Sequence, residues 1–283
     1  MTMARGRSPV TQRRRLAAEL HRLRTASHRT IEEVAEHLEC SSAKISRIEN
    51  NQVAVRIQDA RELLDLYGVQ GSRREELLEV VREARKKGWW SRYSDLLEEG
   101  AETRLSLEEE AARVLIYENS LVTPLLQTPG YARHCLLTRT DATLEIVQRY
   151  VDLRMERQRI LDDPTGPQLT VVLDEAALRR TVGGPDVMDE QVRRLLSDAD
   201  RDDITLLVLP FSAGPHQAMG FPFSIFEFEG EDPRVVYIEM LERGHVIENA
   251  GEVGRYLAAF EQVRARALDT APSRRFIENL IGR

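Results

Sequence analysis

The segment at residues 29–51, RTIEEVAEHLECSSAKISRIENN, constrains the fold of this chain more than any other. It predicts two short helices joined by a tight turn. Thr30 and Glu33 have the spacing of a capping box at the start of the first helix, and Ser41 is placed to cap the second. Apolar residues at helical spacing predict one buried face on each helix. They are Ile31, Val34, Ala35 and Leu38 in the first helix, and Ile45 and Ile48 in the second.

The second helix of this pair, residues 42–49, is expected to expose short polar and cationic side chains. A helix-turn-helix places its second helix in the major groove of DNA, where such side chains contact bases and phosphates. An ordinary helical hairpin with solvated polar faces is the alternative. In the DNA-binding interpretation Ser42, Ala43 and Arg47 face base edges, with Arg47 the candidate for guanine. The other candidates would contact phosphates: Lys44, Ser46, Thr30, Arg13 and Arg14.

Three segments resemble the phage-repressor-like, XRE-type DNA-binding domain: LRT at 23–25, TIEEVAEHL at 30–38 and SSAKISRIEN at 41–50. The resemblance implies a structural ion pair between Arg24 and Glu49. Two positions depart from the family pattern. Ile31 stands where the family often has a phosphate-binding Gln, so one phosphate contact is expected to be missing. Asn51 stands where Gly is common, and Asn tolerates the left-handed backbone of such a turn.

The charge of the chain is unevenly distributed. The net charge is -7 over 283 residues, which by itself argues against binding to nucleic acid. Residues 1–29 nevertheless carry eight arginines against one acid, Glu19. Such asymmetry is expected when one domain meets a phosphate backbone and the other does not. Residues 1–9 are either a basic arm that contacts the DNA backbone or minor groove, or a disordered end with incidental arginines.

Composition favours a globular, cytoplasmic protein. Apolar residues make up 42% of the chain, enough for a core, and no run of about 18 apolar residues suggests a membrane span. The arginine-rich start lacks the apolar segment of a secretory signal. Cys40 and Cys135 are far apart, which favours a reduced protein. No HExxH, CxxC, P-loop or GxGxxG motif is present, so we expect no metal and no cofactor.

The sequence predicts an α+β protein with three regions. Residues 1–70 form an all-α helix-turn-helix domain with the basic arm. Residues 71–105 form an exposed helical connector that ends in Trp89 and Trp90, which either anchor it to the next domain or bind a ligand. Residues 106–283 form a regulatory or interaction domain with a small sheet and packed helices.

The remaining elements follow from the hydrophobic period. Helices are predicted at 11–26, 56–67, 72–88, 107–118, 131–137, 143–161, 174–181, 186–199, 252–268 and from 273 to the end. Strands are predicted at 169–173, 204–209, 223–228 and 235–240. The continuous apolar run at 204–209 indicates a buried central strand, and the last two strands are expected to form a hairpin.

The helix predicted at 143–161 has an arginine-rich face. Its inward residues are expected to be Leu144, Val147, Val151, Met155 and Ile160 or Leu161. The residues expected to point outward are Arg149, Arg154, Arg157 and Arg159. This face is either a second nucleic-acid surface or a solvated face paired with nearby acids.

The loop at 209–223, LPFSAGPHQAMGFPF, is long for a connection between strands. Loops of this kind often bind a partner or cover a cavity, although here the aromatics can also simply pack on the sheet. The candidates for such a surface are Phe211, His216, Phe221 and Phe223. A catalytic pair of Ser212 and His216 lacks a Gly-x-Ser-x-Gly elbow and any defined alignment, so we do not expect an enzyme.

Five further segments are similar to one large actinobacterial regulator family, which includes the WhiJ-like developmental regulators of Streptomyces. They are WWSRYSDLLEEG (89–100), EEEAARVLIYENSLVTPLLQTPGYA (108–132), LTVVLDEAALRRTVGG (169–184), VLPFSAGPHQAMGFPFSIFEF (208–228) and VVYIEM (235–240). The similarity implies a transcription regulator with a C-terminal domain of unassigned function, often encoded beside a small acidic partner protein. It supplies neither a ligand nor catalytic residues.

The sequence therefore predicts a regulator that binds double-stranded DNA, acts as a repressor and forms a homodimer. A dimer would read half-sites about 34 Å apart, or a multiple of that distance. One alternative is an antitoxin-like interaction module whose C-terminal domain binds a small partner protein, with DNA binding secondary. Another is that the C-terminal domain senses a small molecule.

Overall fold

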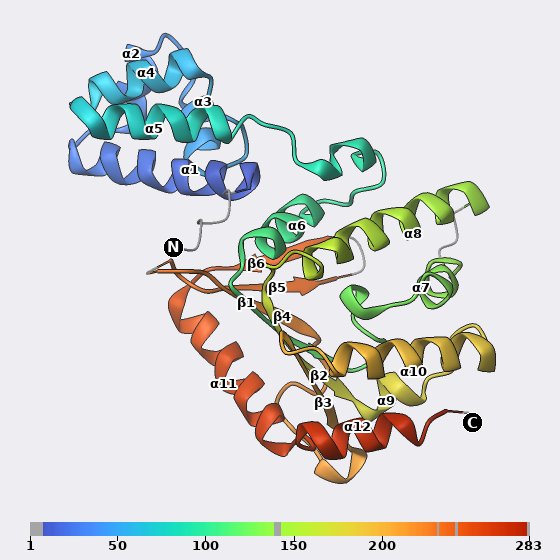
Figure 1. Cartoon of the computed structure of the whole chain (residues 1–283). Helices are drawn as coiled ribbons and strands as arrows, with labels where there is room; N and C mark the ends of the chain where they lie inside the picture. Colours follow the sequence, from blue (N-terminus) through green and yellow to red (C-terminus); the bar gives the residue numbers. More distant parts are fainter. Residues whose placement is uncertain (1–7, 139–142, 231, 241–242, 282–283) are drawn as a thin grey trace. The chain divides into compact units, whose positions relative to one another are not determined.

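The computed structural model describes residues 8–138, 143–230, 232–240 and 243–281. The chain divides into two units, residues 1–91 (unit 1) and residues 92–283 (unit 2). Unit 1 is helical, and unit 2 contains a sheet with surrounding helices (Figure 1). Residues 1–7 of the predicted basic arm lie outside the described residues. The α+β fold class is confirmed.

Unit 1 is all helical around a single apolar core. Its helices are α1 (Pro9–Ala26), α2 (Ile31–His37), α3 (Ser42–Glu49), α4 (Ile57–Leu66) and α5 (Gly71–Glu83). The predicted apolar faces of α2 and α3 meet in this core through Val34, Ala35, Ile45 and Ile48. The sequence suggested an exposed connector at α5. Instead α5 packs against α1 and α4 and contributes Leu77, Leu78 and Val81 to the core.

The start of α2 has the predicted capping box. The Glu33 backbone N–H donates to Thr30 Oγ1 over 3.1 Å, and the Thr30 N–H donates to Glu33 Oε2 over 3.0 Å. The Ser41 side chain likewise caps α3 by accepting from the Lys44 N–H over 3.3 Å. Side chains therefore satisfy backbone donors that would lack a helical partner at each start.

The turn between α2 and α3 depends on one residue with left-handed backbone, Glu39, whose φ is +48°. The next residue, Cys40, donates its N–H to the Ala35 carbonyl over 2.9 Å and closes the end of α2. Asn51 after α3 also has positive φ, +56°, in agreement with its expected tolerance of that conformation. These two turns set the direction of α3 at both ends.

Unit 2 contains a six-stranded mixed sheet in the order β3-β2-β1-β4-β5-β6. The strands are β1 (Arg113–Glu118), β2 (Gln168–Asp174), β3 (Ile204–Leu209), β4 (Phe223–Glu227), β5 (Val235–Glu239) and β6 (Gly244–Ile247). The first three pair in parallel and the others are antiparallel. All four predicted strands are present, and β4 and β5 form the predicted antiparallel pair.

Two sequence predictions about this sheet are wrong. Residues 107–118 were expected to be one helix. Instead α6 (Ala101–Glu110) ends within this range, and β1 follows and pairs with β2 and β4. The apolar run of β1 is buried on both faces, so it lacks the alternation that marks a strand. The run at 204–209 was expected to be a central strand; β3 is an edge strand, buried because α10, α11 and α12 pack on it. Strand β6 was not predicted.

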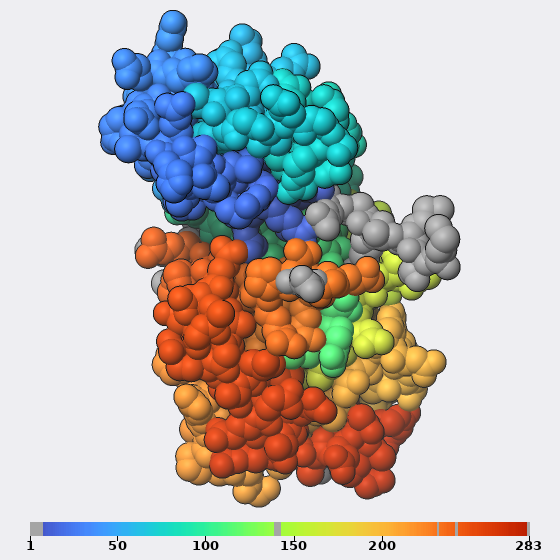
Figure 2. All heavy atoms as spheres, turned by 90° about the vertical axis from the view of Figure 1, so that its left-hand side faces the viewer, coloured from blue at the N-terminus to red at the C-terminus, as the bar shows by residue number. Residues whose placement is uncertain are grey.

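Helices cover both faces of the sheet. Residues of α9 (Glu175–Arg179), α10 (Pro185–Ala199), α12 (Thr270–Glu278) and α7 (Pro129–Leu136) share one core with one face. The other face packs on α11 (Ala250–Arg266), chiefly through Val253, Phe260 and Val263. Figure 2 shows α11 and α12 along the outside of unit 2. A further helix, α8 (Leu144–Gln158), packs against α7.

Candidate nucleic-acid interface

Helix α3 presents part of the predicted base-reading surface to solvent. Ala43 and Arg47 are exposed, while Ser42, Lys44 and Ser46 are half-buried. On the opposite side of the helix, Ile45 and Ile48 are buried in the core of unit 1. The Arg47 Nε donates to the Ala43 carbonyl over 3.3 Å, so in this structure the guanidinium lies along the helix surface. The arrangement leaves a short, shallow face that a DNA groove can approach.

An ion pair ties the end of α3 to α1. Arg24 Nε lies 2.7 Å from Glu49 Oε1, and Arg24 Nη2 lies 2.9 Å from Glu49 Oε2, so the ion pair is bidentate. The Glu49 side chain is only 5% exposed, and His21 Nδ1 also lies 2.9 Å from Glu49 Oε2. Arg24 further donates to the Arg29 carbonyl over 2.9 Å. This is the pair that the resemblance implied, and the hydrogen bonds to Glu49 raise the pKa of Arg24.

The residues predicted to contact phosphates already interact with other groups of the chain. Lys44 Nζ lies 2.7 Å from Asp59 Oδ2, so a phosphate would compete with that carboxylate. The Thr30 hydroxyl is occupied by the capping box, although the residue is exposed. The Ser46 hydroxyl lies 3.2 Å from Asn50 Nδ2. Arg13 and Arg14 are half-buried on α1.

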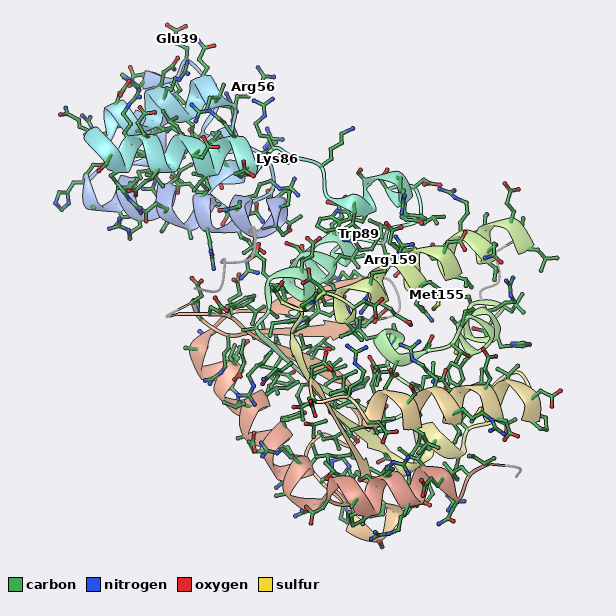
Figure 3. The ribbon with its side chains drawn as sticks, in the orientation of Figure 1. Glu39, Arg56, Lys86, Trp89, Met155 and Arg159 are labelled. Carbon is green, nitrogen blue, oxygen red and sulfur yellow. The ribbon has the colours of Figure 1, made fainter. Side chains whose placement is uncertain are left out.

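Arg56 is a candidate that the sequence analysis missed. It is exposed at the N-cap of α4, and Figure 3 shows its side chain projecting from unit 1. The contact between Lys44 and Asp59 brings the first turn of α4 beside the start of α3. Arg56 therefore directly precedes the turn of α4 that contacts α3 through Asp59 and Lys44. No local sequence signal points to Arg56, because this contact joins two separate helices.

The candidate loop residues of unit 2 separate into two groups. Phe211 and Phe221 are 59% and 63% exposed, and Met219 in the same loop is 60% exposed. Phe223 instead is buried in the core beneath α11. His216 Nε2 lies 3.3 Å from the Tyr117 hydroxyl, and burial lowers the pKa of this histidine. The loop thus has both an exposed apolar tip and aromatics that pack on the sheet.

The tryptophans contact each other at the end of unit 1. Their ring centroids are 5.7 Å apart with an edge-to-face geometry. Trp89 is half-buried and Trp90 is buried, and both lie in a short 3₁₀ helix, Trp89–Tyr93. Figure 3 labels Trp89. Their roles as anchor or ligand contact stay predictions.

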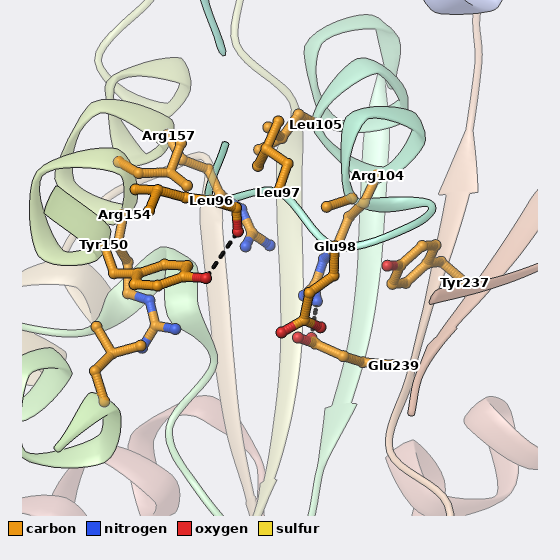
Figure 4. Close-up of a pocket in the computed structure, with 13 residues that line it drawn as sticks. Leu96, Leu97, Glu98, Arg104, Leu105, Tyr150, Arg154, Arg157, Tyr237 and Glu239 are labelled. Carbon is orange, nitrogen blue, oxygen red and sulfur yellow. Dashed lines mark hydrogen bonds and ion pairs between the residues drawn. The ribbon is translucent and has the colours of Figure 1, made fainter. Parts of the chain in front are cut away.

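The predicted arginine face of α8 is not uniformly solvated. Arg149 pairs with Asp95 over 2.6 Å and Arg159 is exposed, as expected for a surface. Arg154 and Arg157, however, line a pocket of unit 2 (Figure 4). Leu144, expected inward, is 74% exposed. The outward prediction was wrong for two of the four arginines because α8 packs on its neighbours along more than one side.

Among the residues that the structure describes, no group of three or more His, Cys, Asp or Glu side chains is arranged to hold a metal ion. None of the helices that the structure describes is long and apolar enough to cross a membrane.

Comparison with known proteins identifies both parts of the chain. A family model described as a helix-turn-helix domain matches residues 15–77. A second, described as a domain of unknown function (DUF5753), matches residues 101–279. Searches of curated proteins and of solved structures found no match. The helix-turn-helix match covers α2, α3 and their supporting helices.

Proposed function

The chain belongs to the DUF5753 family and carries a helix-turn-helix domain of DNA-binding regulators, and from this premise we propose that it is a sequence-specific transcriptional repressor. One observation supports the proposal most directly. The exposed face of α3 is set on a helical scaffold whose core and Arg24–Glu49 pair hold it in place. We also propose that the chain is related to the XRE-type, WhiJ-like actinobacterial regulators. A cytoplasmic location and the absence of a catalytic role are further parts of the proposal.

In the proposed complex α3 enters the major groove. Arg47 reads a guanine, and Ser42 and Ala43 lie against neighbouring base edges. Arg56 at the start of α4 contacts a phosphate beside the groove. Lys44 leaves the Asp59 carboxylate and binds a DNA phosphate, since both anions compete for the same ammonium group.

A homodimer is the proposed binding form. A single domain of this size reads few base pairs, and two copies related by symmetry double the site. The expected operator is an inverted repeat with half-sites about 34 Å apart, or a multiple of that spacing. Sedimentation equilibrium of the full chain at micromolar concentration tests this proposal. A monomer that still bound single half-sites tightly would contradict it.

A partner-controlled interaction module is the second candidate function. The exposed side chains of Phe211, Met219 and Phe221 favour it, because three large apolar groups in one loop are unusual on a solvated surface. In this candidate a small acidic protein covers the loop and switches DNA binding. Co-purification of such a protein with the wild-type chain, and its loss on Phe221→Ser, would support this function.

The experiment that tests the DNA-binding proposal is selection of sites from random duplex DNA, followed by titration with Arg47→Ala. Losing a guanine contact should weaken binding by about 1–3 kcal/mol and relax one base position. Arg82→Ala is the matched control, since it removes an exposed arginine from α5, outside α3 and α4. If Arg47→Ala and Arg82→Ala lose affinity equally, with no change in base preference, the assignment of Arg47 is wrong.

A further inference from the structure

We propose that unit 2 binds a small organic monoanion with an apolar body, such as an aliphatic or aromatic carboxylate, in the pocket between α6, α8 and β5. The pocket has a volume of about 130 Å³. Figure 4 shows Arg154 and Arg157 from α8 on one side, and Arg104 from α6 with Glu239 from β5 on the other. The site lies wholly in unit 2, so the proposal stands or falls separately from DNA binding.

Two of the three arginines are already neutralised by carboxylates. Arg157 Nε and Nη2 lie 2.6 and 2.5 Å from the two oxygens of Glu108. Arg104 Nε lies 3.3 Å from Glu108 Oε1, and Arg104 also pairs with Glu239. Burial lowers the pKa of Arg104, but Glu239 and Glu108 outweigh it and the net shift is upward. These two guanidiniums are therefore structural members of a charged network.

Arg154 differs from the other two. Its Nη1 donates to a neutral amide oxygen, Gln127 Oε1, over 2.6 Å, and no ion pair joins it to a carboxylate of the described residues. Burial, reinforced by repulsion from Arg157, lowers its pKa to about 10. The side chain remains a cation at neutral pH, and its cost of burial is only partly offset, by the electrostatic attraction of Glu239 without a direct ion pair. A bound carboxylate would supply that partner through two parallel hydrogen bonds.

The acids of the pocket gather away from Arg154. In Figure 4 the carboxylates of Glu98 and Glu239 lie on the Arg104 side. Glu118 does not line the pocket but interacts electrostatically with Arg104 and Arg157, and it is held partly protonated because burial raises its pKa to about 7. The cationic end that remains favours a ligand with a single negative charge.

The rest of the lining is apolar and fits a small hydrocarbon body. Leu97, Leu105, Leu136 and Leu153 line the pocket. The Tyr150 hydroxyl donates to the Leu96 carbonyl over 2.8 Å, which fixes its ring at the wall. An apolar cavity of about 150 Å³ is enough to bind benzene. The pocket of about 130 Å³ is thus matched to a ring or chain of about six carbons.

The test is isothermal titration of the full chain with benzoate and hexanoate. We expect one anion per chain, and at least about tenfold weaker binding of the neutral analogues benzamide and hexanamide, since tenfold is the effect of a modest charged contact. Arg154→Gln should weaken benzoate binding at least about tenfold as well. Arg149→Gln is the matched control: it removes an arginine from the same helix that pairs with Asp95 and does not line the pocket, so binding should be unchanged.

A second variant keeps the test decisive if Arg154→Gln does not fold. Leu97 is half-buried outside the helices, and Leu97→Trp should fill the pocket and abolish binding. The proposal is overturned if wild-type protein binds neither acid at millimolar concentration, or if benzoate binds equally to wild type and Leu97→Trp. Binding of inorganic phosphate as tight as that of benzoate would also overturn the apolar monoanion as the ligand class.

Discussion

At the scale of single residues, Arg24 links three parts of unit 1. Its guanidinium contacts Glu49 at the end of α3 and the Arg29 carbonyl in the loop before α2. Both members of the pair are largely shielded, with side chains 12% and 5% exposed. Removal of either one leaves a buried charge without its partner, which is more costly than loss of a surface pair.

We expect Arg24→Ala to lower the free energy of unfolding of unit 1 by about 2–4 kcal/mol. Arg22→Ala is the matched control on the same helix, because Arg22 is 64% exposed and pairs with Glu19 at the surface. That change should have a much smaller effect on stability, because solvent screens an exposed ion pair. Urea denaturation followed by circular dichroism measures the free energy of unfolding of both variants. Equal losses of stability would contradict a structural role for the Arg24–Glu49 pair.

Glu118, also at this scale, couples stability to pH. Burial raises its pKa from 4.5 to about 7, so the native state holds its proton more tightly than the unfolded chain. Between pH 4.5 and about pH 7 the native state binds this proton and the unfolded chain does not, so the free energy of unfolding falls as pH rises through this range. Above about pH 7 both states have lost the proton, and the free energy of unfolding falls no further on account of Glu118.

Glu118→Gln removes this ionisation. The variant should gain stability relative to wild type on the order of 1–3 kcal/mol between pH 4.5 and pH 7, with little further change above. Glu229→Gln, at an exposed carboxylate, controls for the loss of one charge. Chemical denaturation at several pH values gives the difference, and a pH-independent difference for Glu118→Gln would contradict the raised pKa.

At the scale of elements, the helix-turn-helix depends on the turn after α2. Glu39 has a left-handed backbone there, and its side chain projects outward (Figure 3). A residue with a Cβ is strained in this conformation, whereas glycine is not. The turn is therefore a place where the chain can be made more stable without changing its contacts.

Glu39→Gly should stabilise unit 1 by about 0.5–1 kcal/mol, because it relieves this strain. Glu36→Gly in α2 is the matched control and should destabilise by about 1 kcal/mol, since glycine disfavours a helix. Thermal unfolding of the two variants should shift in opposite directions. Destabilisation by both would mean that the Glu39 side chain contributes more than the strain it causes.

At the scale of the whole molecule, each unit has its own apolar core. Leu20, Leu64 and Leu78 lie in the core of unit 1, whereas Phe226 and Phe260 lie in separate apolar clusters of unit 2. Separate cores favour separate cooperative unfolding. Differential scanning calorimetry of the full chain should therefore resolve two transitions.

Variants assign these transitions. Arg24→Ala should lower one of them, and Phe260→Leu, in the core beneath α11, should lower the other. A single transition that both variants shift alike would show instead that the two units unfold as one.

Much of this protein is encoded in local sequence. The capping box, Ser41, the apolar spacing and the turn before Cys40 all lie within one short segment, and together they determined α2 and α3. Unit 2 strands with β-branched and aromatic runs were likewise predictable, as was the β4–β5 hairpin, because neighbouring segments pair through a short connection. The sequence alone thus established the α+β class and the candidate recognition helix.

Tertiary structure decided the rest, because the determining contacts join residues far apart in the chain. The run VLIY in β1 is compatible with a helix or a strand, and pairing with β2 and β4 selects the strand. The apolar sequence of β3 is typical of a central strand, but β3 lies at the edge of the sheet and is buried by the helices packed on it. Arg154 faces a pocket only because α8 lies opposite α6 and β5. Helical periodicity identifies a face, but packing determines what that face meets.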